Sequence, residues 1–209
     1  MKKLLLFAIT LSMVISCTKA PSPTVEDVKE PETESPKELY NGFSKFGVED
    51  ISNDLFMINH EWMLVTGGTE SSFNTMTASW GGFGTMWEKP VAFMAIRDTR
   101  YTFSFLQKEP VYTISFYDES YKDKLQDLGS RSGKNTEKVK ESGLTPLAMP
   151  SGAMAFKEAK MVIECKKLLS EPISPKYITD KEVADKWYNA KEPGVHNLFF
   201  GEIVGVWKK

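Results

Sequence analysis

The feature that most constrains this fold is a series of short strand-like runs that begins near Leu39 and continues to the end of the chain. Apolar, β-branched and aromatic residues form the runs, and glycine or proline marks the turns between them. The pattern predicts strands at 61–66 (ended by Gly67-Gly68), 73–79, 91–96, 111–116, 156–168 and 199–207. It predicts helices at 101–108, 120–128, 136–142 and 180–188, the last with Asp180 as its N-cap. Many short strands with few helices predict a mainly β protein with helices (α+β), built as a β-barrel rather than a βαβ array.

Composition excludes several classes of function. The chain has 209 residues and a formal net charge of -2, which argues against a nucleic-acid binder because no basic excess is present. Its two cysteines, Cys17 and Cys165, exclude a disulfide framework, and two histidines are too few for a His-rich metal site. No metal is therefore expected. Cys165 lies in an apolar stretch and is predicted to be a buried small hydrophobe rather than a redox nucleophile.

The first residues have the features of an export signal. Lys2 and Lys3 precede an apolar run at 4–15, which as a helix would span about 18 Å of a hydrocarbon core about 30 Å thick. The run is too short for a permanent membrane span. Val14-Ile15-Ser16-Cys17 resembles a bacterial lipobox, so residues 1–16 are predicted to be a lipoprotein signal peptide and Cys17 the lipid-attachment site. The alternative is an ordinary signal peptide with a chance cysteine.

Residues 17–38 are predicted to be a flexible, lipid-anchored linker. Residues 18–38 hold four prolines, six acidic and three basic residues, and almost no large apolar side chains. Such a segment cannot bury enough surface to offset its ordering entropy, and proline keeps it extended. Residues 39–209 are then the folded domain. The expected location is the bacterial cell envelope, with membrane contact through the lipid only and the periplasmic side favoured.

Two segments have a composition suited to ligand binding. In Phe73–Gly84, hydroxyl side chains and glycines flank what looks like an exposed turn, and Trp80 offers a flat apolar face. This segment could wrap a planar aromatic heterocycle, or it could be a strand and bulge with aromatic packing. In Arg97–Thr102, two guanidiniums and a hydroxyl stand at a predicted helix N-terminus, which suits a phosphate. The alternative there is a surface turn with a threonine cap. Together the segments suggest one nucleotide-like ligand.

The same segments carry a resemblance to a known family. Asn74–Gly82, Trp87–Phe93 and Ile96–Thr102 resemble the flavoredoxin branch of the flavin reductase family. The resemblance continues through Ser115–Asp118, Tyr121–Asp123, Gly129–Gly133, Gly143–Pro146 and Gly201–Ile203, so it covers nearly all of 62–206 in order. No dinucleotide-binding, P-loop or Gly-x-Ser-x-Gly motif competes with this interpretation.

The resemblance implies a split β-barrel that binds FMN non-covalently and is usually a homodimer. It places the flavin ring and ribityl chain along Asn74, Met76, Thr77, Ala78, Ser79 and Trp80. It places the phosphate at Arg97, Arg100, Tyr101 and Thr102. His196 falls where family members often carry a histidine near the flavin, although residues 170–195 match the family poorly.

The export signal departs from the family, whose members are typically cytoplasmic. The main hypothesis is therefore an FMN-binding redox flavoprotein at the cell envelope, which carries electrons or reduces a small acceptor as a flavin-dependent oxidoreductase. Its electron donor and acceptor are not named by the sequence. One alternative is an NAD(P)H-dependent flavin reductase. A second is a non-enzymatic ligand-binding lipoprotein that has kept the barrel, since a fold does not fix a function.

Overall fold

The computed structural model describes residues 39–52, 54, 56–189, 191 and 193–209. The predicted signal peptide at 1–16, the predicted linker at 17–38 and Cys17 lie outside the described residues. Within the described part of the chain, no helix combines the length and apolar character needed to cross a membrane.

In the described part of the chain, nine strands form one sheet and two short strands form another. The main sheet runs in the order β1-β2-β11-β10-β7-β3-β4, and β6 pairs with both β11 and β5. Its strands are β1 (Leu39–Tyr40), β2 (Phe43–Phe46), β3 (Met63–Thr69), β4 (Ser72–Ala78), β5 (Gly81–Met86), β6 (Lys89–Arg97), β7 (Val111–Phe116), β10 (Met161–Pro172) and β11 (His196–Lys208). The small sheet pairs β8 (Pro146–Ala148) with β9 (Met154–Phe156).

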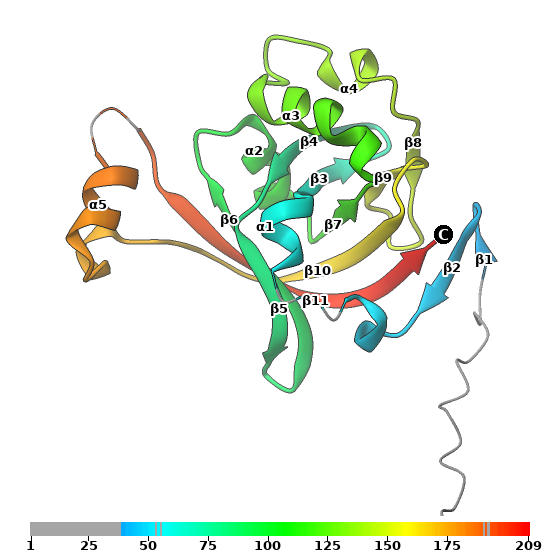
Figure 1. The fold of residues 1–209 in the computed structure, drawn as a ribbon, viewed down its shortest axis with the longest axis horizontal. Coiled ribbons are helices and arrows are strands. Elements are labelled where there is room, and N and C mark those ends of the chain that lie inside the picture. Colours follow the sequence, from blue (N-terminus) through cyan, green and yellow to red (C-terminus); the bar gives the residue numbers. More distant parts are fainter. Residues whose placement is uncertain (1–38, 53, 55, 190, 192) are drawn as a thin grey trace, which may run out of the picture. The chain divides into compact units, whose positions relative to one another are not determined.

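Five α-helices lie between the strands of the described chain. They are α1 (Met57–Glu61), α2 (Tyr101–Lys108), α3 (Lys122–Ser130), α4 (Lys138–Glu141) and α5 (Lys181–Trp187). Short 3-10 turns are found at Val48–Asp50, Glu119–Tyr121 and Pro175–Tyr177. Figure 1 shows α2, α3 and α4 gathered beside β3 and β4, whereas α5 stands apart at the far ends of β10 and β11. The Asp180 side chain accepts the Val183 N–H at 3.1 Å, as expected of an N-cap.

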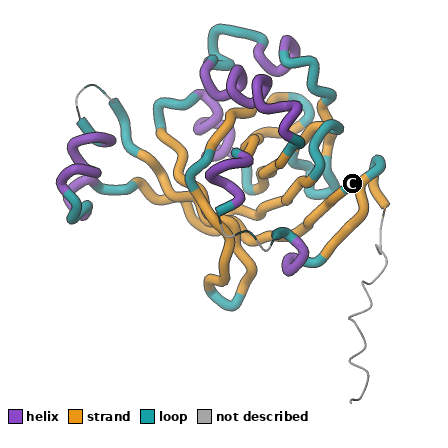
Figure 2. The backbone as a smooth tube through the Cα atoms, viewed as in Figure 1, coloured by secondary structure: helices purple, strands orange, loops and turns teal. Residues whose placement is uncertain are grey.

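The long strands β10 and β11 bend the sheet. β11 pairs with β10 along its length, with β6 over its first half and with β2 near its end. The register between β10 and β11 shifts at Glu164/Cys165 and again at Lys167/Leu169, and such bulges bend and twist a strand. The result is a curled sheet that forms a half-barrel (Figure 2). The prediction of a mainly β split barrel with helices is confirmed.

The core consists of two clusters on the two faces of the sheet. On β3, Met63 and Val65 enter one cluster while Leu64 enters the other, as the alternation of side chains along a strand requires. The first cluster fills the barrel and includes Ile114. The second lies under α3 and the small sheet and includes Trp207. Both faces of β3 are therefore buried, which explains its continuous apolar run.

Three local predictions were wrong. Gly67 and Gly68 do not end a strand, because β3 continues to Thr69 and a Cβ at Gly67 would lie 3.0 Å from Leu106 on α2. Glycine at position 67 therefore allows α2 to pack close against β3. The predicted strand 156–168 is two strands, β9 and β10, separated by a turn in which Ala159 N–H donates to Phe156 O. The exposed turn expected near Gly81 is instead strand β5, paired with β6.

The prediction for Cys165 is confirmed. Its side chain is fully buried, and burial is the main reason that the pKa of its thiol is raised to about 12. A thiol with this pKa stays protonated at neutral pH, so it is a poor nucleophile.

Candidate functional site

The candidate site follows the outer edge of β4. This strand ends the sheet order, and none of the described strands pairs with that edge. Helix α3 lies beside it, and the Thr77 hydroxyl donates to Leu125 O across 2.5 Å. Helix α2 packs against β4 and its neighbour β3. The site therefore sits where the sheet edge meets the start of α2 and the end of α3.

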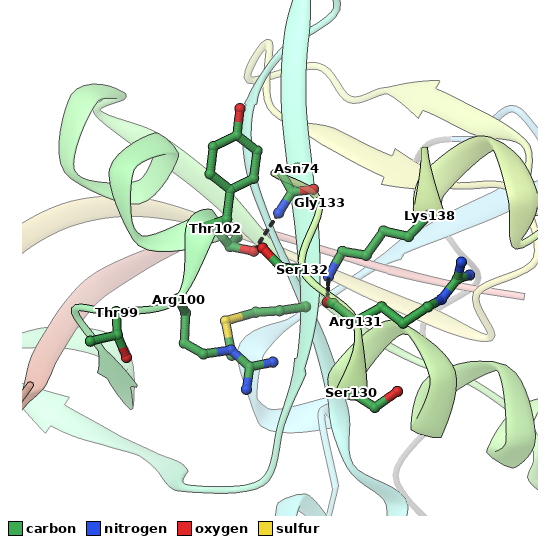
Figure 3. Close-up of a pocket in the computed structure, with 11 residues that line it drawn as sticks. Asn74, Thr99, Arg100, Thr102, Ser130, Arg131, Ser132, Gly133 and Lys138 are labelled. Carbon is green, nitrogen blue, oxygen red and sulfur yellow. Dashed lines mark hydrogen bonds between the residues drawn. The ribbon is translucent and has the colours of Figure 1, made fainter. Parts of the chain in front are cut away.

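The first hollow at this edge, which we call the polar cavity, has a volume of about 160 Å³. Its lining comes from β4, the turn before α2, the end of α3 and the segment that leads to α4. Figure 3 shows these side chains around the cavity. They are Asn74, Met76, Thr99, Arg100, Tyr101, Thr102, Ser130, Arg131, Ser132, Gly133 and Lys138.

Two cationic side chains face the polar cavity. The Arg100 guanidinium donates to Gly129 O, and the Lys138 ammonium donates to Leu128 O at 2.8 Å and Arg131 O at 3.0 Å. Both cations thus hold carbonyls at the end of α3. The Arg131 guanidinium points away from the cavity in Figure 3, and its ion pairs are with Asp127 and Glu141.

The cations are held in a poorly solvated place. Lys138 is only 2% exposed, and burial, followed by repulsion from Arg100 and Arg131, lowers the pKa of its ammonium to about 8. Burial also lowers the pKa of the Arg100 guanidinium. An anion in the cavity would relieve both effects, because an opposite charge favours the protonated form.

Backbone and hydroxyl donors complete the polar cavity. Helix α2 begins at Tyr101, and the Phe103 N–H already donates to Arg100 O at 2.9 Å, so the N–H groups of Tyr101 and Thr102 are the ones that precede the first helical bond. The Asn74 amide donates to the Thr102 hydroxyl at 2.7 Å, and both residues are buried. This bond ties the start of α2 to β4. Two cations, hydroxyls and a helix N-terminus are a donor set that fits a phosphate dianion.

A second hollow, the open pocket, adjoins the polar cavity. Its volume is about 300 Å³, and it shares Met76, Thr99 and Arg100 with the polar cavity. The rest of its lining is Thr77, Ala78, Ser79, Trp80, Ala95, Arg97 and His196. A smaller hollow of about 190 Å³ continues from the same β4 residues toward α3 and Trp62. Residues of β4 line all three hollows.

Aromatic side chains form one wall of the open pocket. The Trp80 ring lies 4.7 Å from the His196 ring and, edge to face, 4.7 Å from the Trp187 ring. Trp80 remains 38% exposed, so part of its flat face is available to a ligand. The His196 Nδ1 lies 3.2 Å from the Tyr188 hydroxyl. Flat apolar faces beside the hydroxyls of Thr77 and Ser79 suit a planar heterocycle with polar edges.

Arg97 lies on the open pocket and not on the polar cavity. Its guanidinium donates to Trp187 O at 2.8 Å and to Pro193 O and Gly194 O at 3.2 Å. The same group lies 5.9 Å from the Tyr188 ring. Arg97 therefore fastens the segment around α5 to β6, whereas Arg100 faces the position suited to a phosphate.

The structure brings every described candidate residue to these adjoining hollows. Sequence reasoning did not select six residues that line the polar cavity, namely Thr99, Ser130, Arg131, Ser132, Gly133 and Lys138. The run Ser130–Gly133, with small hydroxyl residues and a glycine, was the available signal for an anion-binding loop. Nothing local distinguishes Lys138 from its neighbours. Among the described residues, no group of three or more His, Cys, Asp or Glu could hold a metal ion.

Comparison with known proteins identifies the family. Residues 57–209 match the family model described as "Flavin reductase like domain". The chain belongs to this family. Its membership supports a flavin-related redox role. No curated protein matches the chain significantly.

Solved structures of similar fold carry related names. A flavoredoxin of Desulfovibrio vulgaris (Miyazaki F) is 23% identical with a TM-score of 0.56, over 78% of this chain and 75% of that one. An FMN-binding protein from Thermus thermophilus, with bound 1-cyclohex-2-enone, is 22% identical with a TM-score of 0.56, over 75% and 77%. A flavoredoxin from Methanosarcina acetivorans is 17% identical with a TM-score of 0.55, over 76% and 74%. At these identities the likeness shows the shared fold.

Proposed function

We propose that this protein binds FMN non-covalently and acts as a redox flavoprotein of the cell envelope. The observation that carries the proposal is the pair of adjoining hollows along β4. One is built for a phosphate and the other for a planar ring, and both use Met76, Thr99 and Arg100. The names of the Thermus and Desulfovibrio proteins, an FMN-binding protein and a flavoredoxin, support the same ligand.

Each part of the site has a distinct task in this proposal. Arg100, Lys138 and the first N–H groups of α2 hold the phosphate, with the hydroxyl of Ser132 beside them. The residues from Met76 to Trp80 contact the ring and ribityl chain, and His196 stands beside the ring. When bound, FMN supplies the electron transfer, and the protein tunes its potential and its access to other molecules. Trp80, with the Trp187 ring edge to face against it, forms part of the wall of the open pocket.

The cell-envelope role rests on the export signal and the predicted lipid attachment at Cys17. Reduced nicotinamides are not expected to be plentiful outside the inner membrane, so we propose that the electron donor is another protein or a small reductant. The family name favours the alternative of an NAD(P)H-dependent flavin reductase. The two functions share the same FMN site and differ in the donor.

Two measurements on the purified full chain test the proposal. The visible spectrum should show bound oxidised flavin, and denaturation should release FMN rather than a covalent adduct. A colourless protein that takes up no added FMN would contradict the proposal and favour a non-enzymatic binding protein.

In stopped-flow mixing, dithionite should bleach the flavin readily and NADH or NADPH only slowly. Turnover with NADH or NADPH of about 10 s⁻¹, ordinary for an enzyme, would instead support the flavin reductase alternative.

A further inference from the structure

Tyr188 immediately follows α5 and contacts His196 at the start of β11. Its hydroxyl lies 3.2 Å from His196 Nδ1, and the two rings meet edge to face at 5.7 Å. His196 lines the open pocket, whereas Tyr188 is not among the residues that line it. Tyr188 can therefore act on a ligand in that pocket through His196 rather than by direct contact.

Arg97 holds Tyr188 in this position. The Arg97 guanidinium donates to the carbonyl of Trp187, the residue before Tyr188, at 2.8 Å, and it lies 5.9 Å from the Tyr188 ring. The Tyr188 backbone N–H donates to Ala184 O at 2.9 Å, which ties the residue to the end of α5. Arg97 and His196 are directly paired across β6 and β11. The side chains of Arg97, Tyr188 and His196 thus form a connected group, and the protein sets its geometry before any ligand binds.

The charge of Arg97 favours the Tyr188 hydroxyl as the donor in its contact with His196. A neutral imidazole carries its proton on one of its two nitrogens, and the bond made by the other nitrogen selects which one. Burial raises the pKa of the Tyr188 hydroxyl, with Arg97 acting in the opposite direction, so this phenol keeps its proton at neutral pH. A phenol can donate or accept, but donation moves negative charge onto the phenolic oxygen, which the nearby guanidinium stabilises. The same guanidinium disfavours a second positive charge on His196.

We propose that Tyr188 is a positioning residue, which donates a hydrogen bond to His196 Nδ1 and so keeps the imidazole proton on Nε2. The inference rests on the proposed flavin site and gives His196 a definite role there, because the imidazole then meets the flavin ring as a hydrogen-bond donor. A donor beside the ring stabilises the negative charge that the flavin carries once reduced, and it therefore raises the midpoint potential. The α5 segment, which stands apart from the body of the barrel, thereby tunes the redox chemistry of the site (Figure 1).

Nitrogen NMR of the flavin-free full chain tests the proton position directly. The chain contains two histidines, His60 and His196, and His60→Gln assigns the two sets of resonances. At about pH 9, where an ordinary imidazole is neutral, His196 should carry its proton on Nε2. In Tyr188→Phe, which keeps the ring and removes the hydroxyl, the Nδ1 resonance should shift because its hydrogen bond is lost. A proton on Nδ1 in the unmodified protein, or an unchanged His196 spectrum in Tyr188→Phe, overturns the inference.

The same spectra provide two controls. His60 is exposed and its Nε2 lies 2.8 Å from Asp54 Oδ2, so its resonances should be the same in Tyr188→Phe, which also shows that this variant is folded. Tyr177→Phe is the matched variant, because Tyr177 is 75% exposed in the segment before α5 and lines none of the three hollows. It should leave the His196 spectrum unchanged. A shift of the same size in Tyr177→Phe would contradict a specific role for Tyr188.

A dye-linked redox titration of the FMN-loaded protein measures the consequence for the flavin. Tyr188→Phe and His196→Phe should each lower the midpoint potential of bound FMN. Because Tyr188 acts through His196, the double variant should have the potential of His196→Phe alone. An unchanged potential in Tyr188→Phe, or a further fall in the double variant, overturns the inference. An unmodified protein that binds no FMN overturns the proposed function instead, whereas the NMR result on the flavin-free chain does not depend on flavin binding.

Discussion

Single side chains in the polar cavity combine structural and ligand-binding roles. Lys138 is a buried cation that holds the last carbonyls of α3, and it also faces the position suited to a phosphate. In the sequence it stands among the lysines of a charged stretch, with Lys134 and Lys140 nearby. Only the packing shows that Lys138 is buried while Lys134 and Lys140 are exposed.

The two arginines of the Arg97–Thr102 segment should behave differently. Arg100→Ala should weaken FMN at least tenfold, since a charge-assisted hydrogen bond contributes roughly 1.5–3 kcal/mol, and should weaken riboflavin, which lacks the phosphate, much less. Arg97→Ala is the matched control. Its guanidinium is bonded to carbonyls around α5, so the ratio of FMN to riboflavin affinity should persist. Fluorescence titration with both flavins checks this. Equal affinity of the unmodified protein for riboflavin and FMN would contradict the prediction that Arg100 binds the FMN phosphate.

The affinity for FMN should depend on pH through Lys138. In the free protein the pKa of its ammonium is about 8, and a bound phosphate dianion raises that pKa. Between the two pKa values the complex retains a proton that the free protein has lost, so affinity falls as pH rises above about 8. Titrations from about pH 7 to pH 10 measure the fall. In Lys138→Met the affinity should be lower and the fall should disappear. A fall that persists unchanged in the variant would exclude Lys138 as its source.

At the level of elements, the contact between α2 and β3 positions the phosphate site. Leu106 of α2 packs directly on Gly67 of β3, where its backbone nitrogen lies 3.0 Å from the ideal Cβ position. The Asn74–Thr102 bond fixes the same helix to β4. These two contacts set where the first N–H groups of α2 point, and hence where an anion can bind.

Gly67→Ala should therefore disturb both stability and binding. A methyl group at this position would lie 3.0 Å from the Leu106 backbone nitrogen, so α2 must move away slightly, and overpacking of this kind costs about 1–3 kcal/mol of unfolding free energy. The shift of α2 should also weaken FMN. Gly84→Ala is the matched control, because Gly84 lies in β5 with no atom within 4 Å of the added Cβ. Chemical denaturation and FMN titration of both variants test the expectation, and equal stability of the two would refute it.

At the scale of the whole molecule, the segment before Leu39 is predicted to decide where the protein works. Cys17→Ala should abolish lipid attachment, because the thiol is the predicted acylation site. The variant should lose radiolabelled lipid and partition into the aqueous phase of a detergent extraction. Retention of the label, or unchanged partitioning, would show that Cys17 is not the anchor. FMN binding should be unaffected, which provides the control.

We also predict that the protein is a homodimer. The hairpin of β5 and β6 carries Trp87, which is 60% exposed, at its tip. Trp80, which precedes the hairpin, is exposed as well. Exposed aromatic side chains of this kind are typical of interface cores. Light scattering of the flavin-loaded protein at micromolar concentration should report a dimer. A monomer would indicate that these aromatic side chains make contacts only within their own chain.

The sequence by itself determined the class of fold and the two segments that meet at the site. Strand alternation, turn residues and the segments 74–80 and 97–102 are local patterns, because they depend on residues close together in the chain. The tertiary structure decided which distant groups join them. Ser130–Gly133 and Lys138 reach β4 only because α3 packs on its edge, and Arg97 separates from Arg100 only because the α5 segment returns to β6. Contacts between segments far apart in the chain depend on how the whole sheet curls, and no local spacing encodes that.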